Sequence, residues 1–266
     1  MSLFLSRPDA APRLVGVVHL LPLPGAPARS PGLSAVIARA VADARALAEG
    51  GADAAIVENL GDAPFAAEVV GPETVTAMTA VLLAVRDAVP RLPLGVNVLR
   101  NDALAALSIA AVTGASFIRV NVLTGVMATD QGLITGRARE LLQLRTRLGA
   151  EHVHIAADIL VKHATPLGPV ELEDVARDTF HRGGADAILI TGTGTGRPTD
   201  LGDLRRARAA IPTAPIWVAS GVVPDQAAAL RGLVDVAVVG TWLHEGGELG
   251  LPVDAARVAR MRAALG

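Results

Sequence analysis

The amino-acid sequence predicts a (β/α)₈ barrel, and three observations support this fold class. Eight short runs of mainly Val, Ile, Leu and Ala alternate along the chain with stretches of helical periodicity. The interiors of these runs are continuously apolar, which is typical of parallel strands covered on both faces. The first run is followed by LLPLPGAPARS rather than by the glycine-rich loop of a doubly wound open sheet. We therefore expect one barrel domain over residues 1–266, without an interdomain linker.

The predicted strands are four to seven residues long, which is the usual length of a buried strand. In chain order they are Leu14–Leu20, Ala54–Val57, Leu94–Leu99, Phe117–Val122, Val153–Asp158, Ala187–Ile190, Pro215–Ala219 and Val236–Gly240.

The stretches between the strands are predicted to be helices that cover the barrel. Apolar residues from Val36 to Ala48 share one broad face, and Gly50 ends that helix. Pro72 stands at a first-turn position before the apolar positions of residues 75–89. Asp102 caps a third helix. The other predicted helices cover residues 172–179 or begin near Gly136, Thr199, Pro224 and Asp254.

Composition excludes several classes of function. The chain has 24 Lys and Arg against 26 Asp and Glu, so a protein that binds nucleic-acid phosphates or an anionic membrane is not expected. It has no cysteine, which excludes disulfides, thiolate nucleophiles and cysteine metal ligands. The N-terminus lacks a signal-peptide pattern, and the longest uncharged stretch, Ala103–Ile118, is shorter than the ~20 apolar residues of a membrane span. We expect a cytoplasmic protein with no integral membrane segment and no nucleic-acid partner.

Polar residues at the ends of the predicted strands are the candidate catalytic residues, because active sites of this fold lie at the C-terminal ends of the strands. They are His19, Glu58, Asn97, Arg119, Asn121, Asp158, Lys162 and His163. Buried charges are costly without partners, so we expect these side chains to surround a shared polar cavity.

Strand alternation places Arg119 and Asn121 on one face. Arg119 either lies inside the barrel mouth, paired with a carboxylate such as Glu58, or points outward at a helix. Asp158 is the strongest single candidate for a general base or a metal ligand.

The remaining candidates each have a functional and a structural interpretation. Lys162 is a Schiff-base nucleophile or an electrophile, or else a solvated loop lysine. His19 and His163 are functional or simply satisfied structural histidines. Asp62 is interpreted as a turn residue.

Three glycine-containing strand ends predict a phosphate site. Alternating Thr and Gly over residues 191–196 exposes backbone N–H groups and hydroxyls, and no GK[ST] follows as in a P-loop. Phosphate sites in these barrels commonly use the loops after strands 7 and 8. The predicted phosphate-binding residues are Gly192, Thr193, Gly194, Thr195, Gly196, Ser220, Gly221, Gly240 and Thr241.

Several segments closely resemble the BtpA/SgcQ family over about residues 14–258. They include VGVVHLLPLPGAP (15–27), GGADAAIVENLGDAPF (50–65), GVNVLRND (95–102), FIRVNVLTG (117–125), VKHATPL (161–167) and TGTGTGRPTDL (191–201). The chain departs at AADILVKHA, where Ile159-Leu160 replace an expected Val-His pair. The resemblance implies a barrel of the ribulose-phosphate-binding superfamily. One member is implicated in photosystem I biogenesis or stability, and another lies among sugar-metabolism genes.

Two functions of different classes follow. The first is an enzyme acting on a small phosphorylated metabolite, such as a sugar phosphate or a phosphoribosyl or nucleoside-type compound. Isomerase, epimerase or lyase chemistry would use Glu58 and Asp158 as acid and base, with Arg119 or Lys162 stabilising an oxyanion. No cofactor is predicted, and a divalent ion held by the two carboxylates and His163 is the alternative. The second is a non-catalytic factor for the biogenesis or stability of photosystem I or another membrane complex. A homo-oligomer is expected in either case.

Overall fold

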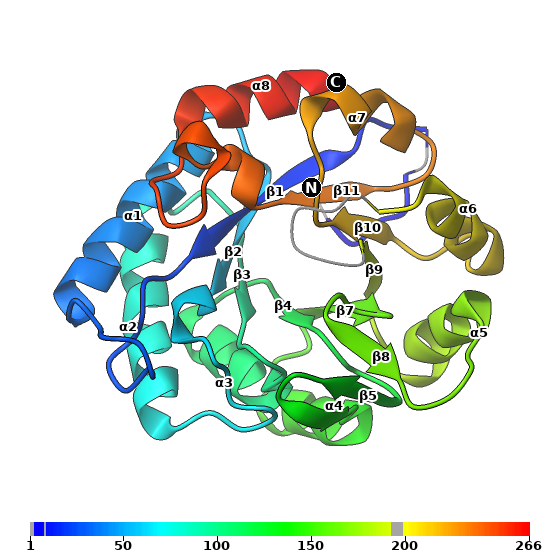
Figure 1. Ribbon diagram of the computed structural model, residues 1–266, viewed down its shortest axis with the longest axis horizontal. Helices are drawn as coiled ribbons and strands as arrows, with labels where there is room; N and C mark the ends of the chain where they lie inside the picture. Colours follow the sequence, from blue (N-terminus) through cyan, green and yellow to red (C-terminus); the bar gives the residue numbers. More distant parts are fainter. Residues whose placement is uncertain (1–2, 8, 193–198) are drawn as a thin grey trace.

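The predicted fold class is confirmed. The computed structural model describes residues 3–7, 9–192 and 199–266, and eight parallel strands among them close into a barrel. Around the barrel the strands follow the order β1-β11-β10-β9-β7-β4-β3-β2. Figure 1 looks along the barrel and shows the helices surrounding the strands.

The eight barrel strands lie where the apolar runs predict them, and no strand end is shifted by more than two residues. They are β1 (Arg13–His19), β2 (Ala54–Glu58), β3 (Leu94–Asn97), β4 (Phe117–Val120), β7 (His154–Ile159), β9 (Ala187–Thr191), β10 (Ile216–Ala219) and β11 (Val236–Val239).

The outer layer consists of α-helices that follow the strands, supplemented by short turns of 3-10 or π-helix. The α-helices are α1 (Leu33–Glu49), α2 (Pro72–Ala88), α3 (Ala103–Thr113), α4 (Ala138–Arg147), α5 (Leu172–Arg177), α6 (Leu201–Ala210), α7 (Pro224–Leu230) and α8 (Ala255–Leu265). The short elements are η1 (Leu60–Asp62), η2 (Asp178–Arg182), η3 (Thr241–Leu243) and η4 (Glu245–Gly247). The predicted cap Asp102 is confirmed, because its side chain accepts a hydrogen bond from a first-turn backbone N–H, and Asp254 caps α8 in the same way.

A second, three-stranded sheet was not predicted from the sequence. It consists of β5 (Val126–Thr129), β6 (Gly132–Thr135) and β8 (Ala164–Pro166), in the order β6-β5-β8. The hairpin follows β4 and the third strand follows β7, so the sheet joins the loops of two neighbouring barrel strands. These strands have three or four residues and are only partly buried, which leaves a weak apolar pattern in the sequence.

Aromatic side chains close the N-terminal end of the barrel. Phe117 and His154 begin their strands, and Trp217 lies near the start of its strand. The ring of Phe4 packs against all three, with centroid distances of 4.4 Å to His154, 5.1 Å to Trp217 and 5.9 Å to Phe117. These aromatic side chains fill this end of the barrel, whereas Glu58 and Asn97 are the last residues of their strands, at the opposite, C-terminal end.

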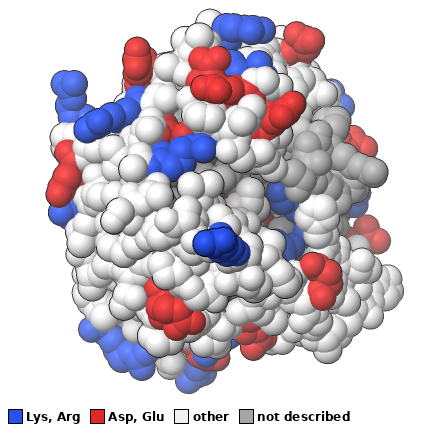
Figure 2. Space-filling model, turned by 60° about the vertical axis from the view of Figure 1, so that its left-hand side comes forward, with Lys and Arg blue, Asp and Glu red and all other residues white. Residues whose placement is uncertain are grey.

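Within the described ranges, no helix combines the length and the apolar character needed to cross a bilayer. Figure 2 shows acidic and basic side chains interspersed over one face of the molecule.

Candidate active site

The parallel register of the first three strands places three polar side chains in one row. His19, the last residue of β1, pairs with Glu58 of β2, and Glu58 pairs with Asn97 of β3. All three residues end their strands, so the row lies at the C-terminal rim of the barrel. Asn97 Nδ2 donates a hydrogen bond of 2.5 Å to Glu58 Oε2, and His19 Nε2 lies 3.9 Å from Glu58 Oε1.

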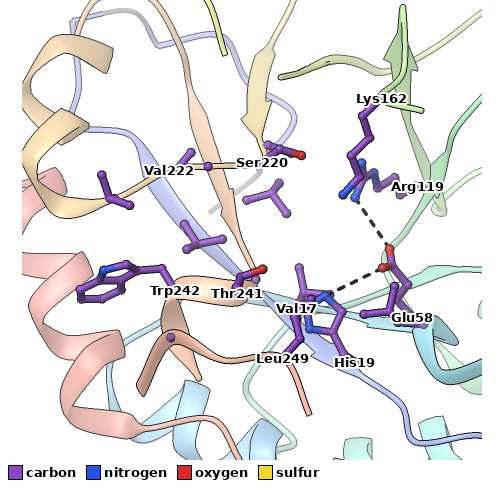
Figure 3. A pocket seen from close by; sticks show the side chains of 18 residues that line it. Val17, His19, Glu58, Arg119, Lys162, Ser220, Val222, Thr241, Trp242 and Leu249 are labelled. Carbon is purple, nitrogen blue, oxygen red and sulfur yellow. Dashed lines mark ion pairs between the residues drawn. The ribbon is translucent and has the colours of Figure 1, made fainter. Parts of the chain in front are cut away.

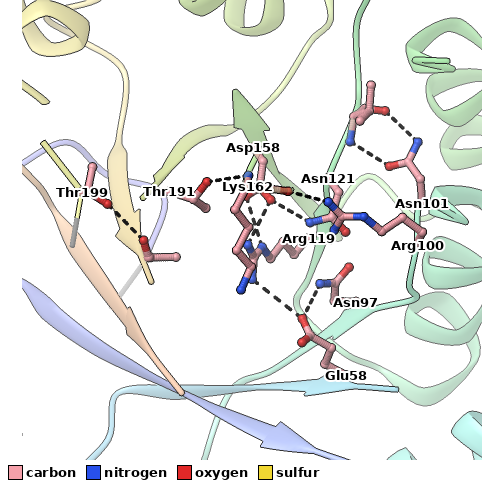
Figure 4. Close-up of polar contacts among 12 residues, drawn as sticks. Glu58, Asn97, Arg100, Asn101, Arg119, Asn121, Asp158, Lys162, Thr191 and Thr199 are labelled. Atoms are coloured by element: carbon pink, nitrogen blue, oxygen red, sulfur yellow. Dashed lines mark hydrogen bonds and ion pairs between the residues drawn. The ribbon is translucent and has the colours of Figure 1, made fainter. Parts of the chain in front are cut away.

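Arg119 lies inside the barrel mouth, as the first of its two predicted orientations requires. Its Nε and Nη2 atoms donate to the two carboxylate oxygens of Asp158 at 3.2 and 3.0 Å. Its Nη1 atom lies 3.8 Å from Glu58 Oε2. Asn121 is also buried and donates from Nδ2 to Asp158 Oδ2 at 2.7 Å. Figure 4 shows the guanidinium of Arg119 joining the two carboxylates.

The charges in this group are mutually stabilised. Burial alone raises the pKa of Glu58, but Arg119, His19, Lys162 and the hydrogen bond from Asn97 outweigh it and lower the pKa below its ordinary value. Burial likewise acts to lower the pKa of Arg119, while the two carboxylates raise it above its ordinary value. Glu58 is therefore an anion and Arg119 a cation at neutral pH.

A cavity of about 230 Å³ opens at this end of the barrel. Four of the predicted catalytic residues line it. They are His19, Glu58, Arg119 and Lys162. Four predicted phosphate-binding residues also line it. They are Ser220, Gly221, Gly240 and Thr241. Figure 3 shows Ser220 and Thr241 on one side of the cavity and Glu58, Arg119 and Lys162 on the other, with His19 next to Thr241.

The two loops that carry Ser220 and Gly240 have constrained conformations. Ser220 has a φ of 72° and Gly221 a φ of 64°, both in the left-handed region that L side chains rarely adopt. A non-glycine residue there costs of order 1 kcal/mol, and such residues cluster at functional sites. A Cβ atom added to Gly240 would lie 2.7 Å from Cε1 of His19, so a larger residue at this position would displace the His19 ring.

Lys162 reaches the cavity from the segment after β7. Its backbone N–H donates to Thr191 Oγ1 at 3.0 Å, and its carbonyl accepts from Arg100 Nη2 at 2.7 Å. Burial and the positive charges of Arg119 and Arg100 lower the pKa of Lys162, while Glu58 and Asp158 act to raise it. The loop therefore holds a partly buried amine against the carboxylates.

The other predicted residues that the structure describes do not line the cavity. Asn97 donates a hydrogen bond to Glu58, and Asp158 accepts hydrogen bonds from both Arg119 and Asn121. His163 is exposed and is absent from the cavity wall. Gly192 is buried just after β9, whereas Thr193, Gly194, Thr195 and Gly196 lie outside the described residues.

The metal-binding alternative is not supported by the arrangement of its donors. Both oxygens of Asp158 accept hydrogen bonds from Arg119, whose guanidinium separates that carboxylate from Glu58. His163 stands apart from this pair at the surface. Among the residues that the structure describes, no three His, Asp or Glu side chains gather as a metal site would require.

Sequence reasoning missed His244, which contacts His19. Its Nε2 atom lies 3.0 Å from Nδ1 of His19, although 225 residues separate the two in the chain. His244 follows η3 rather than a strand, so its position in the sequence carries no signal. Asp62 is confirmed as a turn residue, since it accepts hydrogen bonds from the backbone of Leu23 and the side chain of Asn59.

The pKa of His19 predicts a loss of stability in acid. Burial lowers this pKa to about 4; Glu58 opposes the shift, while His244, Lys162 and Arg119 add to it. The unfolded chain binds the proton near pH 6.5 and the folded chain only near about 4, so the free energy of unfolding falls as the pH drops through this window. The expected contribution is up to about 3 kcal/mol.

Urea denaturation between about pH 7 and pH 4.5 measures this effect. The His19→Asn variant, which cannot titrate there, should lose less stability over that range than the wild type. His152→Asn, at an exposed position, serves as the matched control and should follow the wild type. Equal acid sensitivity of all three proteins would contradict the assignment to His19.

Solved structures with little sequence similarity share the fold. KGPDC from Streptococcus mutans superimposes with a TM-score of 0.59 at 13% identity, covering 96% of this chain and 98% of that one. Phosphoribosyl anthranilate isomerase from Thermococcus kodakaraensis gives a TM-score of 0.55 at 15% identity, covering 96% and 98%. At these identities the likeness concerns the fold alone.

Sequence relatives give a more specific result. The photosystem I biogenesis protein BtpA of Synechocystis sp. is 48% identical over 92% of this chain and 85% of its own. An uncharacterized protein of Pyrococcus horikoshii is 49% identical over 88% of each chain. The sgc region protein SgcQ of Escherichia coli is 31% identical over 93% and 91%. Residues 11–265 match the BtpA family, and the chain therefore belongs to that family.

Proposed function

We propose that this protein is an enzyme that moves a proton next to a carbonyl group in a small phosphorylated metabolite. The observation that carries the proposal is that one cavity has glycine-containing loops on one wall and Glu58, Arg119 and Lys162 on the other. Sugar phosphates and phosphoribosyl compounds have both of the features that such a cavity would recognise. The related fold of phosphoribosyl anthranilate isomerase supports a substrate of this class by analogy.

The phosphate group would bind between the Ser220-Gly221 and Gly240-Thr241 loops. Glycine lets the backbone approach an anion closely, and the hydroxyl groups of Ser220 and Thr241 are further donors. These loops follow β10 and β11, the seventh and eighth barrel strands, which is where barrels of this fold commonly bind phosphate.

The reacting end of the substrate would lie against the opposite wall. The Glu58 carboxylate would accept a proton from a C–H group beside a carbonyl, and the electron pair of that bond would move to the carbonyl oxygen. Arg119 and Lys162 would stabilise the resulting enolate oxygen, and Glu58 would return the proton to the same or a neighbouring carbon. Isomerisation and epimerisation share this sequence of steps.

Asp158 has a different part in this proposal from the general base that the sequence analysis favoured. Its side chain is fully buried, both oxygens accept from Arg119, and it is absent from the cavity wall. We assign to it the positioning of Arg119, and we assign proton transfer to Glu58 alone.

Thermal denaturation with a panel of phosphorylated compounds tests the proposal. A true ligand at a hundred times its dissociation constant should add about 2.7 kcal/mol to the free energy of unfolding. Trp242 lines the cavity, so the same ligand should also change tryptophan fluorescence, and the Trp242→Phe variant should lose that change. The proposal fails if no sugar phosphate, phosphoribosyl compound or inorganic phosphate stabilises the protein.

A second candidate function is favoured by the name of one relative. The Synechocystis protein, 48% identical to this chain, is named for photosystem I biogenesis. A non-catalytic factor of that kind would bind photosystem I or another membrane complex through its outer surface. Such a protein would keep its partner after Glu58→Gln substitution, whereas the enzyme would lose its turnover.

A further inference from the structure

Two histidines and a backbone carbonyl form a chain of hydrogen bonds that leads into the cavity. Nδ1 of His244 lies 2.6 Å from the carbonyl oxygen of Leu251, and Nε2 of His244 lies 3.0 Å from Nδ1 of His19. His19 lines the cavity, and His244 is buried behind it with 1% of its surface exposed. The proton transfer proposed above uses neither histidine.

The direction of these hydrogen bonds follows from the carbonyl group, which can only accept. Nδ1 of His244 must therefore carry a hydrogen, and in the neutral ring Nε2 is then an acceptor. The partner atom, Nδ1 of His19, must donate to it. In a neutral His19 this leaves Nε2 without a hydrogen, so a lone pair remains on that atom.

Both rings are neutral at physiological pH. Burial lowers the pKa of His19 to about 4 and also lowers the pKa of His244. The charged and titratable groups that face His19 are Glu58 from β2, Arg119 from β4, Lys162 from the segment after β7, and His244 itself. Of these, only Glu58 favours a protonated His19, and burial outweighs it.

The Nε2 atom of His19 has space beside it. It lies 3.9 Å from Glu58 Oε1, too far for a direct hydrogen bond. Gly240 borders the same edge of the ring, and a Cβ atom added there would lie 3.2 Å from Nε2. The glycine thus leaves the lone pair open to a group bound in the cavity.

We infer that His244 is a positioning residue that fixes the tautomer of His19, so that His19 Nε2 accepts a hydrogen bond from a substrate hydroxyl group beside Glu58. The role toward substrate rests on the proposed function, whereas the tautomer is a property of the protein alone. The inference narrows the substrate to a phosphorylated compound that also has a hydroxyl group near its reacting carbon. Glu58 receives the carbon-bound proton, and His19 holds the neighbouring hydroxyl.

Nuclear magnetic resonance of ¹⁵N-labelled histidine tests the tautomer directly, since protonated and unprotonated ring nitrogens have very different chemical shifts. The His19 signals are identified by their loss in His19→Asn. At neutral pH the wild-type protein should show His19 with hydrogen on Nδ1 and none on Nε2. A His19 ring with hydrogen on Nε2 would overturn the inference without any variant.

Substitutions of His244 test its positioning role. His244→Leu removes the acceptor and should change the His19 tautomer, because the ring can then turn or donate to Glu58. His244→Gln retains a side-chain carbonyl that can accept from Nδ1, and should preserve the wild-type pattern. His152→Leu is the control at an exposed site. An unchanged His19 tautomer in a folded His244→Leu variant would contradict the positioning role of His244. If that variant does not fold, loss of the wild-type His19 tautomer in His244→Gln would contradict the role instead.

The substrate role has a separate readout. For a ligand found by thermal denaturation, the analogue lacking the hydroxyl should lose affinity for the wild type by about tenfold or more. The affinity of this analogue should change little when His19 is replaced by asparagine. If no phosphorylated compound binds, the proposed function fails, but the assignment of the His19 tautomer is not affected. If a compound binds but its hydroxyl has no effect, only the substrate role of His19 fails.

Discussion

Replacing Asp158 with leucine is expected to lower the free energy of unfolding by about 3–5 kcal/mol, because it leaves the buried Arg119 without its main partner. The Arg119 side chain is 6% exposed and that of Asp158 is 0% exposed. Glu58, 3.8 Å from the guanidinium, compensates only in part. Chemical denaturation measures the loss.

Two further variants separate the pairing of charges from the loss of packing. The double variant Arg119→Met with Asp158→Leu should be more stable than Asp158→Leu alone, since it removes the unpaired cation as well. Asp174→Leu breaks an ion pair between exposed side chains, with Arg177, and should change the stability by no more than about 1 kcal/mol. A loss of less than about 1 kcal/mol in Asp158→Leu would refute the view that Asp158 holds Arg119.

Replacing Glu58 with glutamine is expected to lower kcat on the substrate of this enzyme by about 10²–10⁴-fold, because the carboxylate that accepts the proton is lost. Glutamine has nearly the same size and can still accept the hydrogen bond from Asn97 through its side-chain oxygen. The proposed phosphate-binding loops, Ser220-Gly221 and Gly240-Thr241, lie on the opposite wall of the cavity and are unchanged, so ligand-induced stabilisation should persist.

Steady-state kinetics and thermal denaturation on the same ligand distinguish the two effects. Glu49→Gln makes the same chemical change at an exposed position at the end of α1 and should leave both unchanged. If Glu58→Gln retained full turnover, the assignment of proton transfer to Glu58 would be wrong. Loss of ligand binding together with turnover would instead place Glu58 in substrate binding.

Much of the barrel follows from local sequence patterns. The continuously apolar runs identify the eight parallel strands because strands covered on both faces have no solvent-exposed face that would need polar residues. Strand alternation also gives the shared inward face of Arg119 and Asn121, which the structure confirms. These features depend on neighbours in the sequence, so one sequence is enough to predict them.

Features that depend on packing between distant segments were beyond such reasoning. His244 gains its importance from a contact with His19 at the other end of the chain. Asp158 lies near the end of its strand as a catalytic carboxylate would, and only its two hydrogen bonds to Arg119 reveal that it is held away from the cavity. The small sheet of β5, β6 and β8 forms because two loops lie side by side in the closed barrel.

A crystal structure of the protein with a phosphorylated compound that stabilises it would show where the phosphate and the reacting end of the compound bind. We expect the phosphate between Ser220-Gly221 and Gly240-Thr241, with the carbonyl end of the compound against Glu58, Arg119 and Lys162. A phosphate group bound outside this cavity, or bound in it with the rest of the molecule directed away from Glu58, would contradict it.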